Sequence, residues 1–265
     1  MVQFILISLL SASWAGIKVE GYVEWRTQVI RATGIAAPNP ALPLAVQRPA
    51  MLEAAKQIAL RNLLQIVKGV YINSETTVEN AMLKSDVIRS KVEGYIRDFR
   101  ILKERYMSDG TLEVDVEVTI SDSLREVLIP KEEGSPQFLA PEPLPEDYTG
   151  VIVDASGLGL RPALAPKVLD EEGHEVYGTK FAKWEKVLKV GLVGYASNLK
   201  EAKADPRVGD KPLVVEAIRV SGKGKTDPVI SSEDALRIHA LAKVKPVLAE
   251  CRNFPNRHRW RLSLL

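Results

Sequence analysis

The clearest pattern in the chain is an alternation of apolar and polar residues over positions 111–120. Leucine, valine and isoleucine occupy every second position, and the positions between them carry Glu113, Asp115, Glu117 and Thr119. Such alternation predicts a strand with one buried face and one face in water. Ser108-Asp109-Gly110 supplies a tight turn before it, with Gly110 suited to a positive φ, so residues 92–107 are expected as the other strand of a hairpin.

The charges of this hairpin also predict its register. If Met107 pairs with Thr111, Arg105 lies opposite Glu113 and Lys103 lies opposite Asp115. Opposite charges directly across a ladder contribute roughly 0.2–1 kcal/mol each. We therefore expect the side chain of Arg105 to contact Glu113.

A helical period replaces the alternation over residues 47–68. One row at four-residue spacing is polar and another is apolar, which is the pattern of an amphipathic helix. The polar row is Glu53, Gln57, Arg61 and Gln65, and the apolar row is Ala55, Ala59, Leu63 and Val67. The alanines allow a close approach by another backbone, and Gly69 after Lys68 is a plausible end of the helix.

Weaker patterns complete both halves of the chain. The first half predicts one or two strands over 16–34, a proline-rich loop over 36–49, a strand over 70–78 and a helix over 79–91. The second half predicts a strand over 151–154, a hairpin over 167–177, a helix over 181–190, a strand over 213–220, and a helix over 233–243 capped by Ser231 or Ser232.

Residues 130–147 contain five prolines and no periodicity, so we expect an extended linker there. The fold class that follows is α+β, with two domains. In the first, residues 16–129, a small antiparallel sheet packs on the amphipathic helix. A second α+β domain follows over residues 148–265.

The first fifteen residues are typical of a signal peptide. Residues 1–10 are mostly apolar, and Ser13 and Ala15 are small residues that suit cleavage after Ala15. The run is too short to span a bilayer, which takes about 20 apolar residues. Lysine and arginine are absent before the apolar run, so a first core strand remains the alternative. The expected location is the periplasm.

Composition excludes several classes of protein. The chain has 265 residues, of which 46% are hydrophobic and 26% charged, and its formal net charge is +2. This charge is too small for a general nucleic-acid or membrane field. With one cysteine, Cys251, neither an intramolecular disulfide nor an all-cysteine zinc site can form, and we expect this thiol to be buried and inert. Three scattered histidines offer few metal ligands, and we expect neither a metal nor a cofactor.

One segment of the second half is a candidate ligand site. Asp154, Gly157 and Gly159 follow a strand with two glycines at the spacing of a dinucleotide turn, and Arg161 could hold an anion there. The third glycine and the helix of a Rossmann unit are missing, so a tight bend is the better interpretation. The acids Asp170-Glu171-Glu172 could bind a cation, but we expect solvated charge at a hairpin tip.

The end of the chain is locally basic with interleaved aromatic residues. Residues 251–261 could contact nucleic acid or anionic lipid, although a frayed terminus is the simpler interpretation. A last apolar strand would be expected after Cys251, and the sequence has this basic tail in its place.

The stretch from Ala54 to Thr76, with its Arg61-Asn62-Leu63-Leu64 and Gly69-Val70-Tyr71 segments, resembles the LPP lipoprotein family. Val92-Glu93-Gly94 and Asp109-Gly110 fit the same pattern, and the resemblance covers about residues 28–120. The family is similar to flagellar proteins such as FlgP and the N-terminal part of FlgT. The resemblance implies a non-catalytic α+β envelope protein. The second half looks like a module of exported proteins that accompanies such domains.

These expectations combine into one functional hypothesis. The chain is expected to be an exported structural or assembly protein, not an enzyme, with envelope or flagellar proteins or its own copies as partners. It has no lipobox cysteine, so contact with the membrane would be indirect. An exposed sheet edge would receive the partner by strand addition. The alternative is a periplasmic ligand-binding or hydrolytic module that uses the turn from Asp154 to Arg161.

Overall fold

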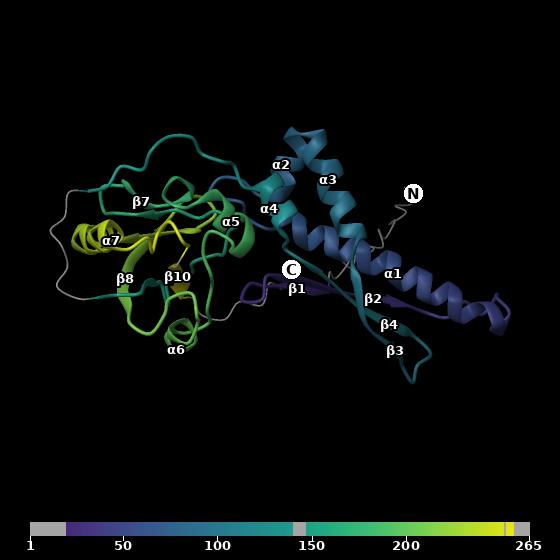
Figure 1. The fold of residues 1–265 in the computed structure, drawn as a ribbon. Coiled ribbons are helices and arrows are strands. Elements are labelled where there is room, and N and C mark those ends of the chain that lie inside the picture. Colours follow the sequence, from purple (N-terminus) through teal and green to yellow (C-terminus); the bar gives the residue numbers. More distant parts are fainter. Residues whose placement is uncertain (1–19, 140–146, 252, 257–265) are drawn as a thin grey trace, which may run out of the picture.

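The computed structural model describes residues 20–139, 147–251 and 253–256. In this range each half of the chain forms its own β-sheet (Figure 1). One hydrophobic cluster runs from Val23 in the first half to Cys251 in the second, so the two halves share a core. The predicted signal peptide, residues 1–15, lies outside the described residues. The predicted fold class, α+β with a small antiparallel sheet on a helix and a second α+β domain, is confirmed.

The first sheet has four strands in the order β1-β2-β4-β3, and all neighbours are antiparallel. The strands are β1 (Gly21–Glu24), β2 (Val29–Ala36), β3 (Arg100–Tyr106) and β4 (Leu112–Thr119). The predicted hairpin register is confirmed, because Arg105 pairs with Glu113 and Lys103 with Asp115. Gly110 has a φ of 85° in the turn. The first arm was predicted too long, since residues 92–97 belong to a helix.

Helix α1 (Leu44–Lys68) covers one face of this sheet. Ala55, Ala59 and Leu63 are fully buried, as the helical period predicted. The close approach takes place at Gly34 of β2, where an added Cβ would lie 2.0 Å from the carbonyl oxygen of Ala55. The helix begins earlier than predicted, at Leu44, and includes Pro49, so the proline-rich loop is shorter than residues 36–49.

Two predictions between α1 and β3 are wrong. Residues 70–77 form a loop and not the predicted strand over 70–78, because the Asn73 side chain accepts the backbone N–H groups of Glu75 and Thr76 and turns the chain. The single helix predicted over 79–91 is two helices, α2 (Val78–Lys84) and α3 (Asp86–Arg97). Ser85 lies between them in the β region and caps α3 by accepting the N–H of Ile88. Helix α4 (Asp122–Leu128) follows β4.

The second sheet has six strands in the order β10-β5-β8-β9-β6-β7, with parallel and antiparallel neighbours. In chain order, the strands and helices of the second half are β5 (Gly150–Asp154), β6 (Val168–Leu169), β7 (Glu175–Tyr177), η1 (Thr179–Phe181), α5 (Trp184–Val190), α6 (Leu199–Lys203), β8 (Pro212–Ser221), β9 (Asp227–Ile230), α7 (Ser232–Val244) and β10 (Asn253–Asn256). The predicted hairpin and the cap of α7 by Ser231 are confirmed. Strand β10 was not predicted, and it pairs in parallel with β5.

The segment predicted as a linker packs against the second half over its described part, residues 130–139. The N–H of Leu139 donates to Nδ1 of His239 at 2.9 Å. The Phe138 ring packs edge-on against the rings of Phe181 and His239, with ring centres 5.4 Å and 5.3 Å apart. Lys167 reaches back to Glu132 at 3.1 Å. The segment is therefore not a free spacer, and the proposed domain boundary within it stays a prediction.

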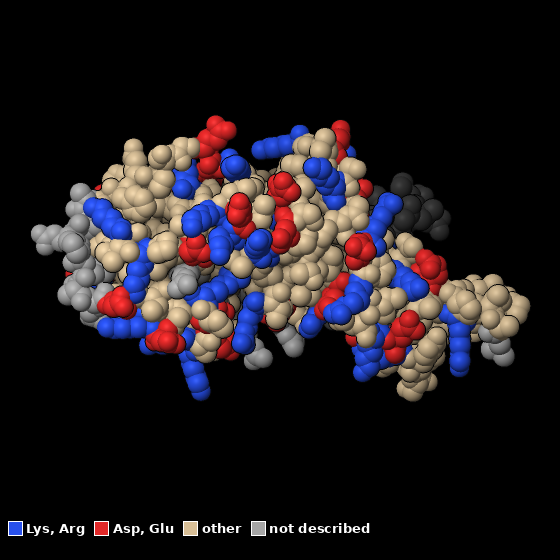
Figure 2. All heavy atoms as spheres, in the orientation of Figure 1, with Lys and Arg blue, Asp and Glu red and all other residues tan. Residues whose placement is uncertain are grey.

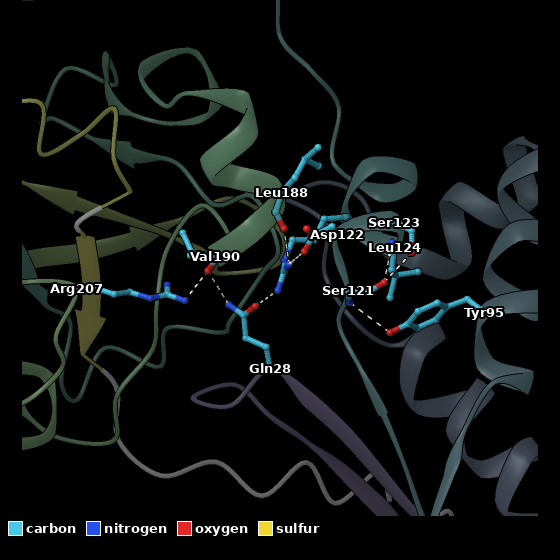
Figure 3. A network of polar contacts seen from close by, with 10 residues as sticks. Gln28, Tyr95, Ser121, Asp122, Ser123, Leu124, Leu188, Val190 and Arg207 are labelled. Carbon is cyan, nitrogen blue, oxygen red and sulfur yellow. Dashed lines mark hydrogen bonds and ion pairs between the residues drawn. The ribbon is translucent and has the colours of Figure 1, made fainter.

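A polar network at the end of α5 joins the two halves (Figure 3). Arg125 of α4 donates to the carbonyl oxygen of Leu188 and to Oε1 of Gln28, and Gln28 donates to the carbonyl oxygen of Val190 at 3.2 Å. Arg207 donates to the same Val190 oxygen. These carbonyls lie in the last turn of a helix, where intrahelical donors are missing. Burial lowers the pKa of the Arg125 guanidinium, which its hydrogen-bond acceptors hold in place.

Candidate functional site

Strand β3 forms one edge of the first sheet, and no strand of the described residues pairs with its outer side. Its side chains are exposed along almost the whole strand. Among them are four apolar or aromatic residues at the surface: Ile101, Leu102, Tyr106 and, just after the strand, Met107. An open edge with apolar side chains is a template for pairing with another chain.

The hydrogen-bond pattern identifies which backbone groups of β3 point outward. Met107 donates its backbone N–H to the carbonyl oxygen of Thr111 at 2.9 Å, so this pair is hydrogen-bonded. Bonded and non-bonded pairs alternate along an antiparallel ladder. Glu104 and Tyr106, which lie opposite Val114 and Leu112, are therefore in non-bonded pairs. Their N–H and C=O groups point away from β4 and are open to a further strand.

A groove of about 780 Å³ adjoins the same end of the strand. It lies between the start of α1 and the tip of the β3–β4 hairpin, and its lining is mostly apolar: Pro38, Ala45, Gln47, Arg48, Met51, Tyr106, Met107 and Gly110. The guanidinium of Arg48 lies 5.3 Å from the centre of the Tyr106 ring. In Figure 1 this end of α1 and the hairpin extend away from the second sheet. The sequence pattern predicted neither side of this groove as a site.

The sheet face opposite α1 is charged, and its acids are already neutralised. Arg105 forms ion pairs with Glu113 at 2.9 Å and with Asp115, while Glu117 lies between Arg100 and Arg31. The hydrogen bond from Arg100 lowers the pKa of Glu117, and that from Arg105 lowers the pKa of Asp115. Lys103 then adds a further positive charge at the edge of β3.

Figure 2 shows mixed blue and red side chains around α1 and the β3–β4 hairpin, with uncharged residues at the tip of the hairpin and at the start of α1.

The residues predicted for a ligand site are used within the fold. Asp154 ends β5 and accepts the N–H of Ser156, and Gly157 and Gly159 take positive φ angles in the bend that follows. Arg161 donates to the hydroxyl of Tyr71 at 3.1 Å, and its guanidinium lies 5.3 Å from the centre of that ring. The bend interpretation agrees with this geometry, and Arg161 fastens the bend to the first half.

Asp170, Glu171 and Glu172 lie at the tip of the β6–β7 hairpin, as predicted, and Glu171 and Glu172 are exposed, but the expectation for Asp170 is wrong. Asp170 is buried, whereas we expected solvated charge, because it accepts the backbone N–H of His174 at 2.7 Å and closes the β6–β7 turn. Ligand atoms of Asp170, Glu172 and His174 lie within 4.8 Å of one another. Asp170 and His174 also line a cavity of about 520 Å³ beside Phe138 and Phe181, and neither Asp154 nor Arg161 lines it.

The comparison with known proteins concerns the second half. Residues 150–253 match the family model of the second domain of Tp0624 from Treponema pallidum. The match begins at the first residue of β5 and ends at the first residue of β10, so it covers the other five strands of the second sheet and not the candidate edge. No curated protein matches the chain significantly. Within the described residues, no helix has the length and apolar character to cross a membrane.

Proposed function

We propose that this chain is an exported, non-catalytic bacterial envelope protein that works as a structural or assembly factor. The observation that carries the proposal is the outer edge of β3, with the amides of Glu104 and Tyr106 directed away from β4 and the apolar groove beside them. An extended segment of a partner protein would add to this edge as a fifth strand.

The envelope location rests on sequence. Residues 1–15 have the pattern of a signal peptide, and residues 28–120 resemble the LPP lipoprotein family. That resemblance includes flagellar proteins, so flagellar components are among the partners we propose. The match of residues 150–253 to a bacterial domain is consistent with such an origin.

The alternative, a ligand or hydrolytic site at the turn from Asp154 to Arg161, has less support. An anion at this turn would need the guanidinium of Arg161, which stacks on Tyr71 and donates to its hydroxyl. Using it for a ligand would cost the contact between the bend and the first half. We therefore favour the edge of β3.

Two substitutions at one position test the proposal. Glu104→Pro removes an N–H that points away from β4, so it blocks strand addition and leaves the β3–β4 ladder intact, as proline is tolerated on strand edges. Glu104→Ala keeps this N–H and is the matched control. Each variant is produced in a bacterial host with its leader. The complexes in the periplasmic fraction are then separated under native conditions and their masses are measured.

We expect a stable complex with an envelope protein for the native chain and for Glu104→Ala, and its loss for Glu104→Pro. A complex unaffected by Glu104→Pro, or a chain that stays in the cytosol with its leader attached, would contradict the proposal.

A further inference from the structure

We infer that the segment received by β3 alternates apolar and acidic residues. This inference rests on the proposed function and specifies the partner's chemistry. It follows from the two faces of β3, which present different side chains on either side of the same open edge.

One face of β3 is set by the register with β4. Ile101, Glu104 and Tyr106 lie opposite Val116, Val114 and Leu112, which are buried on the α1 side of the sheet, and the register shifts by a bulge at Leu102. An added strand would place every second side chain beside Ile101 and Tyr106 and above the groove. Apolar residues at these positions would bury the exposed Tyr106 and Met107 surfaces.

The other face of β3 carries Arg100, Lys103 and Arg105, which lie opposite the acids Glu117, Asp115 and Glu113 of β4. The side chain of Arg100 is 73% exposed. Strand β3 carries three basic residues and one acidic residue, Glu104. Acidic residues in the added strand would meet Lys103 and the exposed side of Arg100, and they would share Arg100 and Arg105 with the acids of β4 that already pair with them.

The same charges disfavour a second copy of this chain as the occupant. Two β3 strands that pair antiparallel about a two-fold axis keep the same faces on the same side of the joint sheet. Arg100, Lys103 and Arg105 of both copies would then share one face, where like charges repel. A hetero-partner with acidic residues removes this repulsion.

Strand β4 itself has the inferred pattern, so its sequence supplies the probe. The experiment uses a labelled peptide with the sequence of residues 111–120, and a matched peptide in which Glu113→Lys, Asp115→Lys and Glu117→Lys are introduced. Binding to the full chain is measured by fluorescence anisotropy at low and high salt, and hydrogen exchange reports on the amides of Glu104 and Tyr106.

We expect the acidic peptide to bind, to protect the amides of Glu104 and Tyr106, and to weaken as salt screens the charges. The lysine peptide should bind less well. Lys103→Glu should weaken the acidic peptide by roughly two- to fivefold and strengthen the lysine peptide, as expected for single cross-strand charge pairs. Glu104→Pro should abolish the binding of both peptides, and Glu104→Ala should not.

Equal affinity for the two peptides, lost in Glu104→Pro, would overturn the charge inference while leaving strand addition intact. Failure of the acidic peptide to protect Glu104 and Tyr106 would also overturn it, and the native-mass experiment would then judge the proposed function separately. Protection of these amides that rises with protein concentration, without peptide, would identify a second copy as the occupant and contradict the inference.

Discussion

Replacing Arg125 with methionine tests whether the network at the end of α5 holds the two halves together. The Arg125 side chain is 6% exposed and donates to Leu188 in the second half and to Gln28 in the first. Methionine fills a similar volume but donates no hydrogen bond, so both acceptors lose this donor.

The magnitude follows from these two losses. A buried acceptor left without its donor costs about 1–3 kcal/mol. Part of this cost is recovered, because methionine has no charge to bury. Burial disfavours the charged form of the Arg125 guanidinium and lowers its pKa. We expect a net loss of about 2–4 kcal/mol in the free energy of unfolding.

Urea denaturation of the full chain measures this loss, with an unchanged m-value expected for a change in stability alone. Lys183→Met is the control, because its ion pair with Glu250 lies at the surface and its removal should leave the midpoint unchanged. An Arg125→Met variant as stable as the native chain would show that the network does not couple the halves.

Three further predictions concern the core. Gly34→Ala should destabilise the chain by at least about 2 kcal/mol in urea denaturation, because its Cβ would collide with the α1 backbone at Ala55. Gly94→Ala, in the open interior of α3, should instead stabilise it by about 0.5–1 kcal/mol, and equal effects would contradict the packing. Burial lowers the pKa of His239 below its unfolded value, so the folded state binds fewer protons and stability falls as pH drops through about 6.5. The stability advantage of the native chain over His239→Gln should therefore shrink between about pH 7.5 and about pH 5, and a constant difference would refute this. Burial raises the pKa of the Cys251 thiol to about 11, so a thiol reagent should modify it only after unfolding, and rapid labelling of the folded chain would show that the site is open.

The sequence predicted best where local patterns agree with tertiary contacts. The β3–β4 register could be derived because three acids on β4 alternate with apolar residues and face basic residues on β3. Helix α1 could be derived from its four-residue period, and the close approach at Ala55 and Ala59 from their small side chains.

Local patterns failed where a single side chain or a distant partner decides the structure. The β-branched residues of 70–78 favour a strand, but the Asn73 side chain turns the chain through its hydrogen bonds. Ser85 interrupts a helical period by capping the next helix. Residues 130–139 are held by His239, about 100 positions beyond Leu139, and by Phe181, about 40 positions beyond Phe138, and no local pattern reveals these contacts.

The candidate site was predictable only in part. An open sheet edge follows from a small antiparallel sheet, and the charges of β3 are visible in the sequence. The groove is not, because Arg48 and Met51 come from α1 while Tyr106 and Met107 come from the hairpin. The role of Arg161 was also hidden, since Tyr71 lies ninety residues away in sequence.

Site-specific photo-crosslinking in living cells tests the central claim most directly. Leu102 at the β3 edge and Leu236 on α7 are equally exposed, at 42%, and each is replaced in turn by benzoylphenylalanine. If a partner strand adds to β3, position 102 crosslinks to an envelope protein, the crosslink is lost when Glu104→Pro is added, and position 236 gives none to that protein. Crosslinks from position 236 alone, or crosslinks from position 102 that survive Glu104→Pro, would contradict it.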